Sequence, residues 1–285
     1  MASIKDIEER IVSVKKTSKI TQAMKMVAAA KFKRLLVQLN MVKESDELFN
    51  DVMQSLASRL FNDDLPDLLQ QNESPQVAFI ILSSDKGLCG GFNSNLFKKI
   101  NQEMGNHQQV DLYLVGNKAQ QFYKSLDVKV VESRSGFKPL EEPEALTHYI
   151  EGIIQSYKNG VYSKVFVIYN EFVSALAANQ VVKQLLPVKL ENWDPNVTTK
   201  ADFIYEPSKM SVLNKLLSRY VDYNFLRAVH ESMASEEGFR MAAMDSASNN
   251  AKDMIQELTL FFNRSRQAAI TTELTEIVAG AASIS

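Results

Sequence analysis

Residues 208–279 contain no proline and a single glycine, Gly238. Proline and glycine are the residues that most often interrupt helices, so this run predicts one continuous helix. At ~1.5 Å per residue it would be roughly 100 Å long, several times the length of an ordinary globular helix. A compact domain cannot enclose a rod of that length. We therefore expect a second long helix and other proteins to bury it.

The N-terminal residues predict the second helix. Residues 1–65 contain neither glycine nor proline, and steps of three and four from Ile4 follow a heptad seam. The seam is weakened in the middle by a serine, a threonine and a lysine. The expected inward positions are Ile4, Ile7, Ile11, Val14, Ser18, Thr21, Lys25, Ala28, Phe32, Leu35, Leu39, Val42, Asp46, Phe49, Met53, Leu56 and Leu60.

The C-terminal run has a seam of its own, rich in small residues that let a partner backbone approach closely. Its expected members are Met244, Ala247, Ala251, Met254, Leu258, Phe261, Ser265, Ala268 and Thr272. A sustained seven-residue repeat predicts a left-handed supercoil. We therefore expect an antiparallel coiled coil made from the two ends of one chain, with the middle of the chain inserted between them.

The middle of the chain changes period. We expect strands at 77–83, 110–115, 128–131, 164–169 and 180–190, and helices at 95–104, 117–126 and 141–157. Strands that alternate with helices at this spacing predict an open, Rossmann-like α/β sheet with helices packed on it, and Pro187 marks an edge or the end of its strand. The predicted domains are a helix at 1–65, an α/β domain at 76–207 and a long helix at 208–285.

Composition excludes several classes of protein. The net charge of −2 does not indicate a nucleic-acid binder, and the single cysteine, Cys89, cannot form an intrachain disulfide and suits a reducing compartment. We expect no signal or transit peptide, because the N-terminal residues pass directly into the heptad seam. The longest apolar run, 77–82, is far shorter than a membrane span, so any association with a membrane is expected to go through a partner.

The N-terminal helix carries an unusual run of basic residues. Between Arg10 and Lys43 every charged residue is a lysine or an arginine. A solvated helix face usually mixes both signs in i,i+4 pairs, and this one does not. A solvated face and an acidic partner surface both stay open as interpretations. Nucleic acid is the less favoured target because the overall charge is slightly negative.

A glycine-rich loop follows the first expected strand, at residues 83–93. Phosphates bind at such strand-to-helix turns in nucleotide-binding folds. However, Lys86 precedes the glycines, whereas a Walker loop has its lysine after them, and the spacing of Gly87, Gly90 and Gly91 does not match the dinucleotide fingerprint. A glycine turn at the end of a strand is the favoured interpretation.

No constellation of catalytic or metal-ligating residues stands out. The histidines, His107, His148 and His230, fall on different expected elements, and Cys89 has no partner that resembles a nucleophilic dyad. We therefore expect no catalytic residue, metal or cofactor, and no enzyme activity of the chain alone. The residues from 275 to 285 are mostly small and uncharged, which indicates an end covered by a partner rather than a frayed tail.

Three stretches together carry a family resemblance that covers essentially the whole chain. They are residues 20–31 (ITQAMKMVAAAK), 84–91 (SDKGLCGG) and 264–277 (RSRQAAITTELTEI). In this order they resemble the gamma subunit of the F-type, rotary ATP synthase. The resemblance implies a non-catalytic central rotor shaft that couples proton-driven rotation of the c-ring to the conformational cycle of the catalytic beta subunits.

The resemblance also implies partners and a location. Three alpha and three beta subunits would surround the coiled coil, and the epsilon subunit and the c-ring would contact the α/β domain. The absence of a transit peptide favours a bacterial subunit, held as a peripheral protein on the cytoplasmic face of the inner membrane only through its partners.

Particular residues match positions that have roles in the family. Met24 and Lys25 match the place where the shaft meets an acidic loop of a beta subunit, and Arg266 and Gln267 match a polar catch near the top of the shaft. The segment with Tyr205 and Glu206 matches a region near the polar loop of the c-ring, and Lys86 matches a contact with the underside of the hexamer. All of these are expectations from the resemblance.

The sequence departs from the family at Gly238-Phe239, where small helix formers are usual, so a local kink is possible there at a cost of ~1 kcal/mol. Two other classes of function remain as alternatives. One is a structural coiled-coil arm protein with a hinge domain that grips nucleic acid or a partner through its basic helix. The other is a nucleotide-binding enzyme built on the glycine loop.

Overall fold

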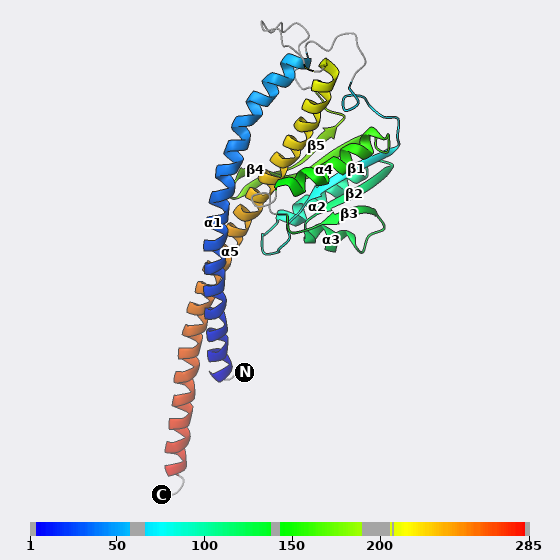
Figure 1. The fold of residues 1–285 in the computed structure, drawn as a ribbon. Helices are drawn as coiled ribbons and strands as arrows, with labels where there is room; N and C mark the ends of the chain where they lie inside the picture. The colour runs from blue at the N-terminus through cyan, green and yellow to red at the C-terminus, as the bar shows by residue number, and fades with distance from the viewer. Residues whose placement is uncertain (1–3, 58–65, 138–142, 190–205, 207, 283–285) are drawn as a thin grey trace. The chain divides into compact units, whose positions relative to one another are not determined.

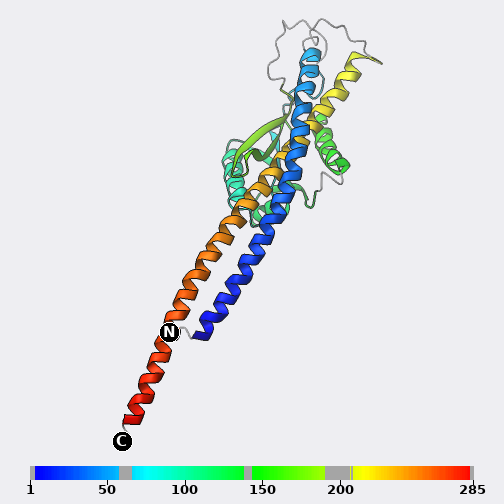
Figure 2. The same cartoon turned by 90° about the vertical axis from the view of Figure 1, so that its left-hand side faces the viewer.

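The structure is a computed structural model that describes residues 4–57, 66–137, 143–189, 206 and 208–282. Its contacts divide the chain into two units. Unit 1 comprises residues 1–29 and 240–285, and unit 2 comprises residues 30–239. Two long helices, α1 (Ile4–Ala57) and α5 (Lys209–Ala282), each contribute to both units. In each unit α1 and α5 lie side by side (Figures 1 and 2).

The pairing of α1 with α5 confirms the prediction of packed terminal helices. In unit 2 the helices run antiparallel, because Lys31 of α1 lies beside Glu237 while Val42, further along α1, accepts a hydrogen bond from Tyr223. Every predicted inward position of α1 from Ile4 to Val42 is buried or half-buried. The predicted positions from Asp46 to Leu60 lie outside the described side chains.

The predicted seam of α5 is wrong at alternate positions. Met254 and Phe261 are exposed, as are Ala268 and Thr272, whereas the residue after each of the first three is half-buried. From Met244 the inward steps run four and then three residues, whereas the prediction ran three and then four. Apolar residues stand side by side at 254–255 and at 261–262, so the sequence fits either register. The less exposed positions are Met244, Ser248, Ala251, Ile255, Leu258, Phe262, Ser265 and Ala269.

Unit 2 contains a five-stranded sheet with the order β3-β2-β1-β4-β5, shown in Figure 1. The pairs β1–β2, β2–β3 and β1–β4 are parallel, and β4–β5 is an antiparallel pair at one edge. The strands are β1 (Gln76–Leu82), β2 (Gln109–Val115), β3 (Lys129–Arg134), β4 (Lys164–Ser174) and β5 (Ala177–Leu186). This arrangement confirms the predicted α/β sheet inserted between the terminal helices.

Helices cover both faces of the sheet. Helices α2 (Phe92–Met104) and α3 (Asn117–Tyr123) bury one face, with Phe79 and Ile81 of β1 pointing toward them. Helix α4 (Pro143–Lys158) and part of α5 bury the other face, where Ile80 of β1 packs with Phe225 of α5. Helix α5 is therefore part of the core of the sheet domain as well as the partner of α1.

The predicted positions of β4 and β5 needed the largest revision. Strand β4 ends later than expected, at Ser174, and β5 begins earlier, at Ala177. The strand β1 pairs with β4 only as far as Ile168, whereas β4 and β5 continue to pair with each other up to Ser174 and Ala177. We call this two-stranded extension, residues 169–181, the ribbon. Its apolar residues are interrupted by Asn170, Glu171, Ser174 and Asn179, so it does not resemble the long apolar run of a buried strand such as β1. Strand β5 ends at Leu186, directly before Pro187, as the prediction for that proline requires.

The predicted kink at Gly238 is not observed as a break, since α5 is continuous through it. The glycine instead permits a close approach of two backbones. A Cβ atom on Gly238 would lie 3.0 Å from the carbonyl oxygen and 3.1 Å from the Cα atom of Ala175, in the turn of the ribbon. A larger residue would press directly on backbone atoms that cannot swing away.

Candidate functional site

The glycine loop is built to satisfy its own polar groups. The buried hydroxyl of Ser84 donates to the carbonyl oxygen of Lys86 at 2.8 Å and accepts from Nδ2 of Asn93 at 2.7 Å. The same Nδ2 lies 3.4 Å from the sulfur of Cys89, which is also buried. Leu88 adopts a positive φ of 63°, so the turn is tight even where there is no glycine. The loop is thus a closed structural turn.

The position that a phosphate would take beside α3 is filled by a carboxylate. Oδ1 of Asp85 accepts from the backbone N–H of Asn117, the first residue of α3, at 3.0 Å, and Oδ2 accepts from the N–H of Gly136 at 2.8 Å. A carboxylate at a helix N-terminus is stabilised by the same N–H groups and dipole that attract phosphate. Asp85 therefore supplies the negative charge from within the chain.

The crevice between β1 and β4 is also occupied. Strand order reverses there, and open α/β sheets usually bind ligands at the carboxyl ends of such strands. Here Ser232 of α5 donates to the carbonyl oxygen of Leu82 at 3.4 Å, and Ser235 donates to that of Asn170 at 3.1 Å. Both serines are buried. Helix α5 packs against the carboxyl ends of β1 and β4, where a nucleotide would bind in such a sheet. This packing argues against the predicted alternative of a nucleotide-binding enzyme.

The histidines are not brought together. The ring of His107 packs against those of Phe79 and Phe166, and His148 is exposed on α4 near Glu151. His230 is buried in α5, and this burial lowers the pKa of its imidazole. No group of metal-ligating side chains occurs among the described residues.

In the same part of the chain, no helix combines the length and the apolar character that crossing a bilayer requires.

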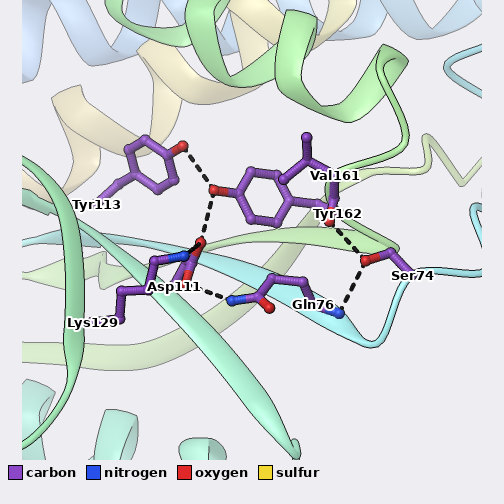
Figure 3. A network of polar contacts seen from close by, with 7 residues as sticks. All are labelled: Ser74, Gln76, Asp111, Tyr113, Lys129, Val161 and Tyr162. Carbon is purple, nitrogen blue, oxygen red and sulfur yellow. Dashed lines mark hydrogen bonds and ion pairs between the residues drawn. The ribbon is translucent and has the colours of Figure 1, made fainter.

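Two buried polar networks hold the sheet domain together, and sequence reasoning missed both. In the first, the buried carboxylate of Asp111 accepts from Gln76 at 2.5 Å, from Lys129 at 2.9 Å and from the hydroxyl of Tyr162 at 3.1 Å (Figure 3). The hydroxyl of Tyr162 also lies 3.0 Å from that of Tyr113. These contacts join β1, β2 and β3 to the loop before β4.

The second network lies on the face of α5 that meets the sheet. Nε of Arg227 donates to Oε1 of Glu231 at 3.1 Å, and the side chain of Glu231 is only 1% exposed. Burial first, and then the charge of Glu231, raises the pKa of the Tyr169 hydroxyl. The i,i+4 spacing of Arg227 and Glu231 was the one available signal, but it is equally common on exposed helix faces.

The residues predicted to bind partners are spread over different places. Met24 and Lys25 are half-buried on α1 in unit 1, where Nζ of Lys25 lies 2.6 Å from Oδ1 of Asp245. Arg266 and Gln267 are exposed on the part of α5 in unit 1. Lys86 and Glu206 are exposed in unit 2, and Tyr205 lies outside the described residues. In unit 1, one end of α5 is therefore open, whereas Lys25 already has an acidic neighbour within the chain.

The C-terminal part of α5 exposes apolar side chains that a folded chain normally covers. All residues from 270 to 279 are exposed. Ile277 and Val278 are 66% and 67% exposed, and Ile270 and Leu274 are also uncovered. Leu260 and Phe261 are also exposed, further back on the same unbroken helix. Exposed apolar side chains gathered on one element are typical of an interaction site.

The comparisons with known proteins agree with this geometry. Residues 3–284 match the family model described as ATP synthase. The ATP synthase gamma chain of Glaesserella parasuis serovar 5 is 39% identical over 289 residues, and the one of Trichlorobacter lovleyi is 38% identical over 288 residues. All of this chain and at least 99% of each relative are covered.

The chain belongs to the ATP synthase gamma family. It is therefore a gamma subunit of an F-type ATP synthase, the central rotor stalk, and it is a non-catalytic subunit of that complex. This membership confirms the resemblance drawn from the three sequence stretches and disfavours the arm-protein alternative.

Chains in two solved structures of mitochondrial ATP synthases have a similar fold. A chain of the Euglena gracilis mitochondrial ATP synthase, in a structure of OSCP, F1 and the c-ring, superposes with a TM-score of 0.73 at 19% identity, with 99% of this chain and 94% of that chain covered. A chain of the Tetrahymena thermophila central stalk and c-ring superposes with a TM-score of 0.59 at 25% identity, with 80% and 99% covered.

Proposed function

We propose that this gamma subunit transmits torque between a proton-driven c-ring and the catalytic beta subunits of its ATP synthase. The observation that carries the proposal is the exposed apolar end of α5. A shaft that turns within a collar of other subunits needs a smooth contact surface with few strong ion pairs. The charged residues in 270–279 are Glu273 and Glu276, and the others are apolar residues or threonines.

Three alpha and three beta subunits are the proposed surroundings of the helix pair. An apolar lining in that collar would cover Leu274 and Ile277. Burial of their side chains would favour binding by about 25 cal/mol per Å² of apolar surface. Arg266 and Gln267 are exposed just before this end and are available for hydrogen bonds to a beta-subunit loop. Met24 and Lys25 are the proposed contact with an acidic beta-subunit loop.

The sheet domain of unit 2 is the proposed contact for the epsilon subunit and the c-ring. Glu206, which is exposed directly before α5, is the proposed residue near the polar loop of the c-ring, and exposed Lys86 is proposed to touch the alpha–beta hexamer. The relatives named above are bacterial, which supports a peripheral position on the cytoplasmic face of the inner membrane through partner subunits.

Hydrolysis of Mg-ATP by alpha and beta subunits from the same source tests the proposal. Adding the full chain should give a stable complex with one copy per three alpha and three beta subunits, and should raise turnover strongly. A chain with Leu274→Asn and Ile277→Asn is the sharper comparison, because both side chains are exposed and the change leaves the folded chain intact. Absence of a complex and unchanged turnover with the unaltered chain would contradict the proposal.

A further inference from the structure

The ribbon, residues 169–181, reaches past the end of the parallel sheet and contacts both long helices within unit 2. Beyond Ile168, β4 pairs only with β5, so the ribbon is not needed to complete the sheet. Its length instead brings side chains to α1 and backbone atoms to α5. Figure 2 shows this pair of strands beside the two helices.

Phe172 of the ribbon forms the contact with α1. Its ring centroid lies 5.7 Å from that of Phe32, and its side chain packs against a small cluster formed by Leu35 and Leu39 of α1 with Ala234 of α5. Leu39 and Ala234 are essentially fully buried. The ribbon is therefore packed into the seam between the two helices rather than onto one of them.

Small residues of α5 allow the sheet domain to approach it closely along one line. Ser232, Ser235 and Gly238 follow each other at three-residue intervals, and each meets backbone atoms of a different residue. Their partners are Leu82 at the end of β1, Asn170 in the ribbon and Ala175 in its turn. Gly238 makes the closest approach, and it is buried. Any larger residue there would lift the turn of the ribbon from α5.

We infer that the ribbon is the joint through which the sheet domain turns the helix pair, and that Gly238 positions it. The ribbon adds a packed contact between the domain and α1 to the packing of α5 on the sheet. With Phe172 in the seam, the domain pushes on both helices. This inference rests on the proposed function in torque transmission and adds the place where the torque enters the shaft.

Gly238→Val in membrane vesicles that carry the complete ATP synthase is the first test. ATP-driven proton uptake per ATP hydrolysed should fall roughly fivefold, because the undocked ribbon no longer drives α1. Hydrogen exchange of the ribbon amides should rise by a similar factor in the same complex. Gly152→Val is the matched control: Gly152 is also a helical glycine, but nothing lies within 4 Å of a Cβ added there.

The second variant, Phe172→Ala, leaves the helix backbone unchanged and decides the question if Gly238→Val does not assemble. It should also lower proton uptake per ATP while raising exchange in the ribbon. Faster exchange with unchanged uptake per ATP in either variant would overturn the inference, and so would reduced uptake without faster exchange. Vesicles with the unaltered chain that hydrolyse ATP without taking up protons would instead contradict the proposed function itself.

Discussion

Lys25 of α1 and Asp245 of α5 form an ion pair in unit 1, with 2.6 Å between Nζ and Oδ1. Both side chains remain accessible, at 40% and 46% exposure. An exposed pair of this kind contributes only about 0.2–1 kcal/mol to the free energy of unfolding. The pair therefore orients Lys25 but adds little to the stability of the fold. It leaves the lysine available to an acidic surface of a partner.

A charge swap separates the two roles of Lys25. We expect Lys25→Glu to change the free energy of unfolding of the isolated chain by about 1 kcal/mol or less, and to lower ATP-driven proton uptake in the assembled complex. The double variant Lys25→Glu with Asp245→Lys restores an ion pair within the chain. Uptake should stay low in it, because the proposed acidic partner still meets a glutamate. Full recovery would show that Lys25 acts only within the chain.

The ion pair of Arg227 and Glu231 should behave differently, because its carboxylate is buried and its guanidinium is only 23% exposed. Removing one partner of a buried pair leaves an uncompensated charge and typically costs about 3–5 kcal/mol. We expect Arg227→Ala to lower the free energy of unfolding by about 3 kcal/mol, since the carboxylate of Glu231 is 1% exposed. Arg219→Ala is the control, because Arg219 is 72% exposed beside Asp222 and its loss should cost less than about 1 kcal/mol. Urea denaturation of both variants measures the contrast, and equal losses would contradict it.

Asp222 predicts a pH dependence of stability. Burial raises the pKa of its carboxyl group to about 6, with a smaller lowering effect of Arg219 and a raising effect of Glu151. The folded chain thus binds this proton more tightly than the unfolded chain, in which the pKa is about 3.8. The ionised group therefore costs stability above pH 6, and that cost disappears as the pH falls from 6 toward 4.

Asp222→Asn should accordingly raise the free energy of unfolding by about 1–2 kcal/mol at pH 8 and by nearly nothing at pH 4. Urea denaturation at both pH values measures the difference. Asp127→Asn is the control, because Asp127 is exposed in the same unit and its replacement should have little effect at either pH. A gain for Asp222→Asn that is equal at pH 4 and pH 8 would contradict the assignment of the effect to ionisation.

Much of the fold could be predicted because its strongest signals are periodic. The register that starts at Ile4 predicted the seam of α1 correctly up to Val42, although apolar residues such as Val12 and Leu36 stand directly beside it. The seam of α5 was assigned one residue too early at Met254 and Phe261, where an apolar neighbour follows directly. Periodicity cannot choose between two adjacent apolar residues, since the choice depends on the partner helix.

The ribbon and the buried polar groups could not be predicted for a different reason. The ribbon is stabilised by contacts with α1 and α5, which are distant in sequence, and its short apolar stretch at 175–178 includes the exposed Leu176. Gly238 appeared to be a weak point of a helix, because its role depends on Ala175, which is distant in sequence. Aspartate is common in turns, so nothing in the sequence marked Asp85 for a special role. Only the folded loop shows that its carboxylate accepts a hydrogen bond at the N-terminus of α3, where a bound anion could otherwise lie.

The apolar end of α5 gives the most direct test of the rotor proposal. Because Leu274 and Ile277 are 58% and 66% exposed, Leu274→Asn with Ile277→Asn should change the free energy of unfolding of the isolated chain by no more than about 0.5 kcal/mol per site. In the complex the same change places polar groups against the proposed apolar collar. ATP hydrolysis by alpha and beta subunits should then require more of the variant chain for half-maximal turnover, by roughly tenfold or more, as a loss of about 1.4 kcal/mol in binding predicts. Glu273→Gln, an exposed change directly before Leu274, is the control. If the double variant activates hydrolysis at the same concentration as the unaltered chain, the apolar end is not the surface that the collar covers.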